Sequence, residues 1–180
     1  MFCPDRVPGE CGVHPAVPTP HLVVGEGRTS SVALSPDGTL LLSGGARRLL
    51  RDPRTGRVLR ALPAEDCLSQ AVMFSPDGLL AAANCSGVPD TIRVWDVATG
   101  EMVGRHVYSR YQFQFSLNRT GHLLSVSEGT VSTVPARGDA APVVLARGEA
   151  AEVAPDGRTV VVVQGRKLHL HNAATGARHG

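Results

Sequence analysis

Two histidines near the end of the sequence have the spacing that comes closest to a metal site. His169 and His171 alternate with Leu168 and Leu170, so in a β-strand both imidazoles project from one face. A zinc site needs at least three protein ligands, and the sequence fixes no third ligand for this pair. We therefore expect a solvated or packed strand face here, with no metal and no cofactor.

A second group of ligand-type side chains lies near the amino terminus, where Cys3, Cys11, His14 and His21 occur among several prolines. Their spacings match no common zinc module, and the prolines favour an irregular tail. We expect no metal site here either. The cysteines of the whole chain are irregularly spaced, so we also expect no disulfide framework; they are Cys3, Cys11, Cys67 and Cys85.

The side chains that could carry out catalysis have a simpler explanation. A serine nucleophile on a strained turn would stand in a Gly-x-Ser-x-Gly segment, and the sequence contains none. Asp37, Asp77 and Asp156 recur within one short motif, which indicates that they shape turns. We therefore expect the chain not to be an enzyme.

Charge and composition argue against several classes of partner. The 180 residues carry a formal net charge of +2, which is too small to recruit nucleic acid. No stretch approaches the roughly 18 apolar residues of a membrane span. Residues 1–20 form a Pro-rich tail without the continuous apolar core of a secretory signal. We expect a cytoplasmic protein that binds neither nucleic acid nor membranes.

The elements that would position these residues are repeated along the chain. The segment Ser35-Pro36-Asp37-Gly38 recurs as Ser75-Pro76-Asp77-Gly78, weakens to Asn118-Arg119-Thr120-Gly121 and returns as Ala154-Pro155-Asp156-Gly157. A second turn marker keeps step with it, at Gly56, Gly100, Gly138 and Gly176. A period near 40 residues is typical of propeller repeats.

Each repeat combines these turns with short apolar runs. Pro and Asp favour the first corners of a tight turn, and Gly accepts the positive φ that reverses the chain. The runs between the turns, such as Val72-Met73-Phe74 and Val160-Val161-Val162-Val163, predict strands packed on both faces. The sequence therefore predicts an all-β fold of four four-stranded antiparallel sheets arranged as β-propeller blades.

Blade two carries the residues of a family resemblance. The segment Thr91-Ile92-Arg93-Val94-Trp95-Asp96, with Phe74-Ser75-Pro76-Asp77-Gly78 upstream, resembles the WD40 repeat proteins. The resemblance covers about residues 21–176 and implies a non-enzymatic scaffold that binds proteins. It also implies a structural role for Trp95 inside its blade. The family's Gly-His dipeptide is replaced by Ala64-Glu65, and Asp90 is at best a displaced form of the family's acid.

The repeats define the expected domain organisation. A propeller domain is expected over residues 21–180, with blades at about 28–62, 68–107, 111–147 and 150–176. Residues 21–24 are expected to supply the outermost strand of the last blade and so latch the ends together. Three arrangements are compatible with this pattern: a closed four-bladed ring, a homodimer of two chains forming eight blades, and an open arc.

The expected contact patch lies where the chain enters the third blade. Tyr108, Arg110 and Tyr111 combine aromatic and cationic side chains at one rim of the propeller, a composition enriched in binding hot spots. The leading hypothesis is a protein-interaction module. The alternatives are a propeller with a metal or hydrolytic site in its central channel, involving His169 or His171, and a partial propeller with only a structural role.

Overall fold

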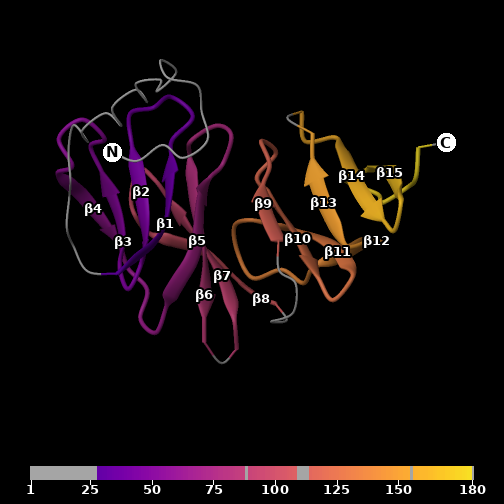
Figure 1. The fold of residues 1–180 in the computed structure, drawn as a ribbon, viewed down its shortest axis with the longest axis horizontal. Helices are drawn as coiled ribbons and strands as arrows, with labels where there is room; N and C mark the ends of the chain where they lie inside the picture. Colours follow the sequence, from indigo (N-terminus) through magenta and orange to yellow (C-terminus); the bar gives the residue numbers. More distant parts are fainter. Residues whose placement is uncertain (1–27, 88, 109–113, 155, 180) are drawn as a thin grey trace, which may run out of the picture.

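The computed structural model describes residues 28–87, 89–108, 114–154 and 156–179. Strands and turns account for these residues, and the described part contains no helix that could cross a membrane. The strands form four antiparallel sheets, each made of strands that follow one another in the sequence (Figure 1). The predicted all-β class and its four sheets are confirmed.

The first two sheets contain four strands each. Blade 1 consists of β1 (Thr29–Leu34), β2 (Leu41–Gly45), β3 (Arg48–Arg51) and β4 (Val58–Leu62). Blade 2 consists of β5 (Leu68–Phe74), β6 (Leu80–Ser86), β7 (Thr91–Asp96) and β8 (Met102–Val107). Short Gly-containing turns join the strands, so each sheet is a simple up-and-down meander.

The last two sheets repeat the pattern. Blade 3 consists of β9 (Gln114–Leu117), β10 (His122–Ser127), β11 (Thr130–Pro135) and β12 (Val143–Arg147). Blade 4 consists of β13 (Ala150–Val153), β14 (Thr159–Gln164) and β15 (Lys167–Asn172). The described part of blade 4 therefore has three strands, one fewer than the other sheets.

Residues after β15 begin to fill the fourth position of blade 4. The N–H of His179 donates to the carbonyl of Leu170 at 2.8 Å, and the N–H of Asn172 donates to the carbonyl of Ala177 at the same distance. Residues 177–179 thus lie along part of the outer edge of β15. The sequence prediction gave this edge to residues 21–24, which lie outside the described residues.

Three apolar clusters fill the junctions between consecutive blades. Leu42 and Leu50 of blade 1 share a cluster with Trp95 of blade 2. The second cluster joins blades 2 and 3, and the third joins blades 3 and 4. Because each interior sheet contributes one face to each of two clusters, its strands are apolar on both faces, as the continuous apolar runs predicted.

The four blades lie in an arc. Blade 1 and blade 4 occupy opposite ends of the longest axis (Figure 1). Neighbouring blades touch through their first strands, β1 against β5, β5 against β9 and β9 against β13. Within the described ranges no buried cluster joins blade 4 to blade 1.

Candidate functional site, a protein-interaction surface

Of the three residues of the predicted contact patch, the structure describes only Tyr108. Tyr108 follows the end of β8, and its N–H donates to the carbonyl of Asp90 at 3.2 Å. Its half-buried side chain packs against the cluster between blades 2 and 3 and lines a cavity of about 280 Å³. Arg110 and Tyr111 lie outside the described residues, so the three-residue patch remains a prediction.

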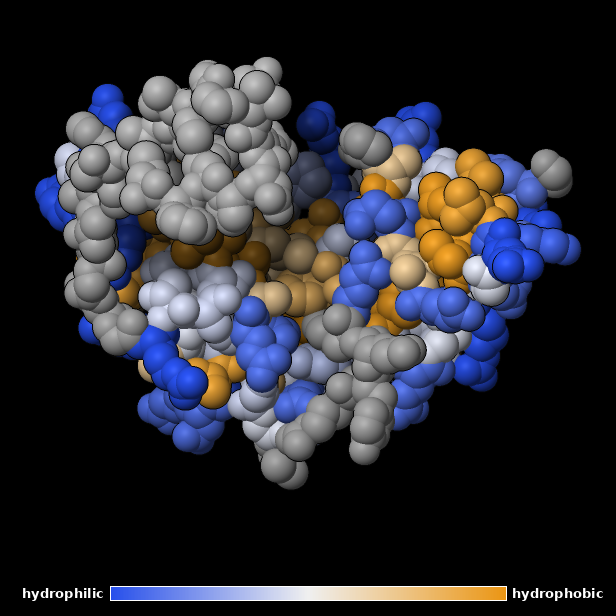
Figure 2. Space-filling model, in the orientation of Figure 1, coloured by the Kyte–Doolittle hydropathy of each residue, from blue (hydrophilic) through white to orange (hydrophobic). Residues whose placement is uncertain are grey.

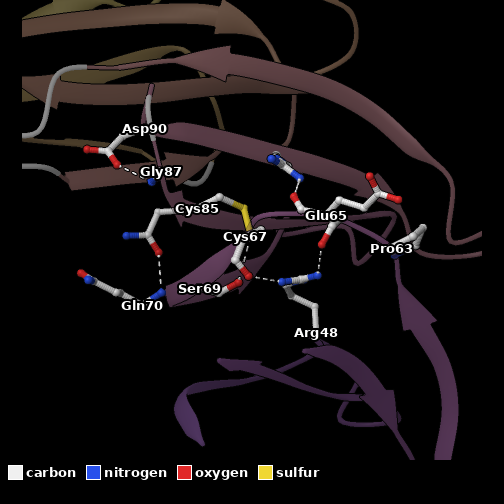
Figure 3. The surroundings of a disulfide bond; sticks show 12 residues. Arg48, Pro63, Glu65, Cys67, Ser69, Gln70, Cys85, Gly87 and Asp90 are labelled. Carbon is white, nitrogen blue, oxygen red and sulfur yellow. Dashed lines mark hydrogen bonds between the residues drawn. A yellow bond between two sulfur atoms is a disulfide. The ribbon is translucent and has the colours of Figure 1, made fainter. Parts of the chain in front are cut away.

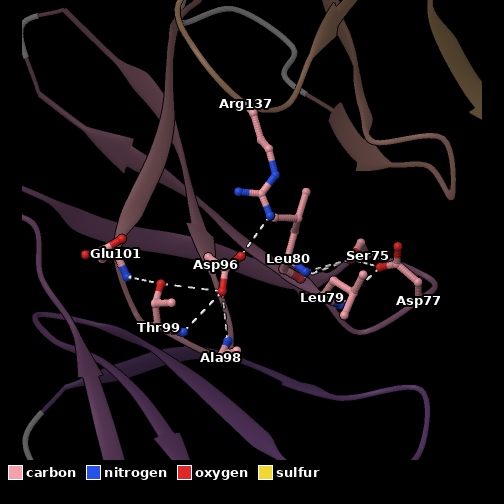
Figure 4. Close-up of polar contacts among 9 residues, drawn as sticks. All are labelled: Ser75, Asp77, Leu79, Leu80, Asp96, Ala98, Thr99, Glu101 and Arg137. Carbon is pink, nitrogen blue, oxygen red and sulfur yellow. Dashed lines mark hydrogen bonds and ion pairs between the residues drawn. The ribbon is translucent and has the colours of Figure 1, made fainter.

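The repeated acidic residues lie in tight turns between the first two strands of their blades. The hydroxyl of Ser35 donates to Asp37 at 2.6 Å, and that of Ser75 donates to Asp77 at 2.5 Å (Figure 4). Asp156 accepts the N–H of Arg158 at 2.9 Å. The glycine that follows each acid, Gly38, Gly78 or Gly157, has φ near +70°, where an L side chain would be strained.

The hydrogen bonds of these turns lower the pKa values of the aspartates that accept them. The hydroxyl of Ser35 and the N–H of Thr39 hold the pKa of Asp37 below its ordinary value. Burial acts to raise the pKa of Asp77, but hydrogen bonds from Ser75 and Leu79 hold it below the ordinary value. Carboxylates kept ionised in this way are turn formers, and they do not hold protons for catalysis near neutral pH.

In blades 1, 2 and 4 the later hairpin turn is held by a second carboxylate or amide, which the repeat motif did not reveal. Asp96 accepts the N–H groups of Ala98 and Thr99, both at 3.1 Å, and Asp52 and Asn172 make equivalent bonds in blades 1 and 4. Asp96 also pairs with Arg137 of blade 3 at 2.8 Å (Figure 4). Arg137, with the N–H of Thr99, lowers the pKa of Asp96.

Trp95 lies inside the junction between blades 1 and 2. Its side chain is fully buried, and the indole N–H donates to the carbonyl of Pro63 at 2.9 Å. Pro63 follows β4 of blade 1, so one hydrogen bond fastens the tryptophan to the neighbouring blade. Burial of this kind leaves Trp95 unable to serve as a contact anchor for a partner.

A disulfide corrects one sequence-based expectation. Cys67 and Cys85 are bonded, with their Cα atoms 4.6 Å apart (Figure 3). The spacing of the cysteines along the sequence does not indicate this pair. The two cysteines meet because β5 and β6 run antiparallel, so that the start of β5 lies beside the end of β6, where Ser69 pairs with Cys85. Disulfides persist mainly in oxidising compartments, so this bond does not favour the predicted cytoplasmic location.

Two arginines near the disulfide hold the linker between blades 1 and 2. Arg48 is buried and donates to the carbonyls of Cys67 and Ala64 (Figure 3). Arg93 donates to the carbonyl of Glu65 at 2.7 Å. Burial, followed by the nearby charge of Arg93, lowers the pKa of Arg48. Both arginines line a cavity of about 560 Å³, and no local pattern in the sequence indicates this arrangement.

The two histidines lie on the same face of β15, as their alternation predicted. His169 pairs with Val162 across the sheet and His171 with Val160, and their ring centroids are 6.5 Å apart. Burial lowers the pKa of His169, and Nδ1 of His171 lies 2.9 Å from the carbonyl oxygen of Gly176. Across the described part of the chain, no cluster of three metal-ligating side chains forms. The amino-terminal cysteines and histidines lie outside that part.

Exposed aliphatic side chains gather on the sheet faces at the two ends of the arc. At one end Val32 and Leu34 project from β1, and at the other Leu168 and Leu170 project from β15. Figure 2 shows apolar surface gathered on the right of the molecule, over the last blade. Polar and charged residues surround this surface (Figure 2).

Comparisons with known proteins agree with this architecture. No family model matches the chain. Over 73 residues it is 36% identical to the small ribosomal subunit protein RACK1 of Caenorhabditis elegans, a WD40 protein. A chain of Kuenenia stuttgartiensis hydrazine synthase superposes with a TM-score of 0.64 at 16% identity, covering 89% of this chain. The chain has a β-propeller fold, and over those 73 residues it is similar to a WD40 protein.

The coverage of these matches differs. The RACK1 match covers 39% of this chain and 21% of RACK1, and the superposition covers 50% of the hydrazine synthase chain. At 16% identity the superposition shows a shared fold alone. The chain therefore spans about a fifth of the curated relative that it matches and half of that solved structure.

Two residues that carry the WD40 resemblance make polar contacts in or beside blade 2. Asp90, in the region of the family's acid, is buried and accepts the N–H of Gly87 at 2.8 Å (Figure 3). Trp95 donates to Pro63, which follows blade 1. Trp95, Arg48 and Arg93 thus fasten blade 2 to blade 1 and to the linker between the two blades.

Proposed function

We propose that this chain is a protein-interaction module without catalytic turnover, and that it binds partners through the sheet faces at the ends of its arc. The observation that carries this proposal is the exposure of Val32, Leu34, Leu168 and Leu170 on those faces. Contiguous exposed apolar side chains rimmed by polar residues are typical of protein interaction sites.

The similarity to RACK1 supports a role in protein interaction, but it does not identify the partner. RACK1 is, by its name, a protein of the small ribosomal subunit. This chain covers 21% of RACK1, so no ribosomal partner is carried over from it. The small net charge of +2 favours proteins over nucleic acid or membranes as partners.

Two further parts of the proposal come from the sequence. Tyr108, Arg110 and Tyr111 form a second proposed contact surface at the entry to blade 3. A cytoplasmic location remains a prediction, and the buried pair Cys67–Cys85 fits an oxidising compartment better.

Affinity purification of the tagged chain with quantitative mass spectrometry tests the proposed function. A specifically enriched protein is expected with the wild type, lost with a Leu168→Glu, Leu170→Glu variant and retained with Leu79→Glu. Leu79 is equally exposed but lies in a turn of blade 2, which makes it the matched control.

A triple variant, Tyr108→Ala, Arg110→Ala and Tyr111→Ala, separates the two proposed surfaces. If this variant loses the partner while the Leu168→Glu, Leu170→Glu variant retains it, the partner binds at the rim of blade 3 and not at the end of the arc. An enrichment profile identical to that of an untagged control would contradict the proposed function.

A further inference from the structure

Two arginines carry positive charge into the junction between blades 1 and 2. Arg48 lies on β3 and is 5% exposed. It pairs with Leu62 across the sheet, so it shares the face of blade 1 that packs on blade 2. Arg93 lies half-buried on β7, two residues before Trp95, and therefore on the face of blade 2 that packs on blade 1. The junction thus holds a cation on each of its two sheets.

Packing alone does not require an arginine at this place in blade 1. Arg48 precedes the turn glycine Gly56 by as many residues as Ile92 precedes Gly100. Ile92 is buried in the apolar cluster between blades 2 and 3. A buried guanidinium in place of an aliphatic side chain is costly unless an anion compensates its charge.

The described residues give these arginines hydrogen bonds but no anion. Arg48 donates to the carbonyls of Cys67 and Ala64 (Figure 3), and Arg93 donates to that of Glu65. The buried Nε atoms of both arginines have no hydrogen-bond partner, and neither arginine forms an ion pair, within the described ranges. A guanidinium carries five N–H groups, so N–H groups on the terminal nitrogens remain for a ligand.

Positive charge is in excess around the same place. Arg47 lines the cavity with the two buried arginines, and Arg105 lies opposite Arg93 in the β7–β8 pairing. The nearby acids are Glu65 and Asp66, both exposed, and the charge of Asp66 acts to raise the pKa of Arg93. Burial and the charge of Arg105 nevertheless lower that pKa. Cations therefore outnumber acids around the cavity.

The cavity itself is large enough for part of a peptide. Its volume of about 560 Å³ lies within the range of about 300–1,000 Å³ that small-ligand sites occupy. Leu62, Pro63 and Met102 add an apolar wall beside the arginines. Figure 3 shows the carboxylate of Glu65 turned away from Arg48. Cationic groups beside an apolar wall match an aliphatic chain that ends in a carboxylate.

We propose that this cavity binds an acidic segment of a protein partner, with a carboxylate held by Arg48 and Arg93. This inference rests on the proposed function, because it names the chemistry of the partner. Arginine donates two parallel N–H groups to a carboxylate, and the apolar wall contacts the methylene groups of a glutamate. Arg47 is exposed at the edge of the cavity, where its charge attracts acidic segments.

Fluorescence anisotropy of labelled hexaglutamate tests the proposal on the full chain, with hexaglutamine as the uncharged probe. Saturable binding at micromolar concentrations is expected for hexaglutamate alone. Arg93→Gln should weaken it about tenfold to a hundredfold, the range for losing a charged hydrogen bond. Arg47→Gln should weaken it about twofold to fivefold, as for an exposed ion pair. Arg57→Gln removes the same charge from an exposed site of blade 1 outside the cavity, and salt screening should keep its effect within about twofold.

An NMR titration locates the probe without any substitution. Hexaglutamate should shift the amide signals of Arg47, Glu65 and Met102, which line the cavity. The signal of Gly165, in the β14–β15 turn of blade 4, should stay in place. Cooperative thermal melting checks that each variant is folded; if Arg93→Gln is unfolded, the titration and Arg47→Gln decide.

Inorganic phosphate separates an acidic peptide from a free anion. Phosphate lacks contacts with the apolar wall, so it should displace hexaglutamate only at far higher concentrations. Displacement at equal concentrations overturns the peptide as ligand. Binding that folded Arg93→Gln and Arg47→Gln leave unchanged, or shifts that avoid the cavity, overturns the site. A chain that does not bind hexaglutamate but still enriches a protein partner overturns the acidic segment and leaves the proposed function in place.

Discussion

Trp95 connects two blades through packing and one hydrogen bond, because its indole is fully buried and donates to Pro63. Trp95→Ala should therefore lower the free energy of unfolding by about 3–5 kcal/mol, through the lost contacts and the cavity left behind. Urea unfolding followed by circular dichroism measures the change. Leu79→Ala, at an exposed site, should stay within about 0.5 kcal/mol of the wild type. Equal midpoints for the two variants would contradict the structural role of Trp95.

Asp96 provides a pH-dependent contact between blades 2 and 3. Arg137 and the N–H of Thr99 lower its pKa, so ionised Asp96 stabilises the fold above its unfolded pKa of about 3.9. That contribution is lost as the pH falls through the lower, folded value. Arg137→Gln should raise the pKa of Asp96 toward its ordinary value, as followed by carboxyl-carbon NMR. Arg105→Gln is the control, and an unchanged pKa in Arg137→Gln would show that the pair does not form in solution.

At the scale of strands, the disulfide ties β5 to β6 with a sequence separation of 18 residues. Cross-linking a loop of this size stabilises a fold by about 2–4 kcal/mol, mainly by restricting the unfolded chain. A reductant should lower the Tm of the wild type and have no effect on a Cys67→Ala, Cys85→Ala variant. Free thiols in the purified, non-reduced protein, with a Tm insensitive to reductant, would contradict the bond.

The strands and their turns could be predicted from the sequence because their signals are local. Pro-Asp-Gly turns, such as that at Asp77, and apolar runs, such as Val160 to Val163, each act within a few residues. The Cys67–Cys85 bond and the buried Arg48 depend on which strands become neighbours, and one sequence does not contain that information locally. Tyr108, which the sequence predicts as part of a contact patch, packs half-buried against the cluster between blades 2 and 3, and its role in binding stays a prediction.

At the scale of the whole molecule, the stability of each blade depends on how many neighbours it has. In repeat architectures the total is close to a sum of single-repeat terms and nearest-neighbour interfaces. Blade 2 has a neighbour on each face, whereas blade 4 has three described strands and one neighbour within the arc. The chain should therefore open first at blade 4.

Hydrogen exchange read by mass spectrometry tests this order of opening. In the wild type, amides of β14 and β15 should exchange faster than those of β6 and β7, because blade 4 packs on one described neighbour and opens locally at a lower cost. Leu79→Glu, at an exposed site, should leave this difference unchanged. Equal exchange in the two blades would contradict the lower stability of blade 4.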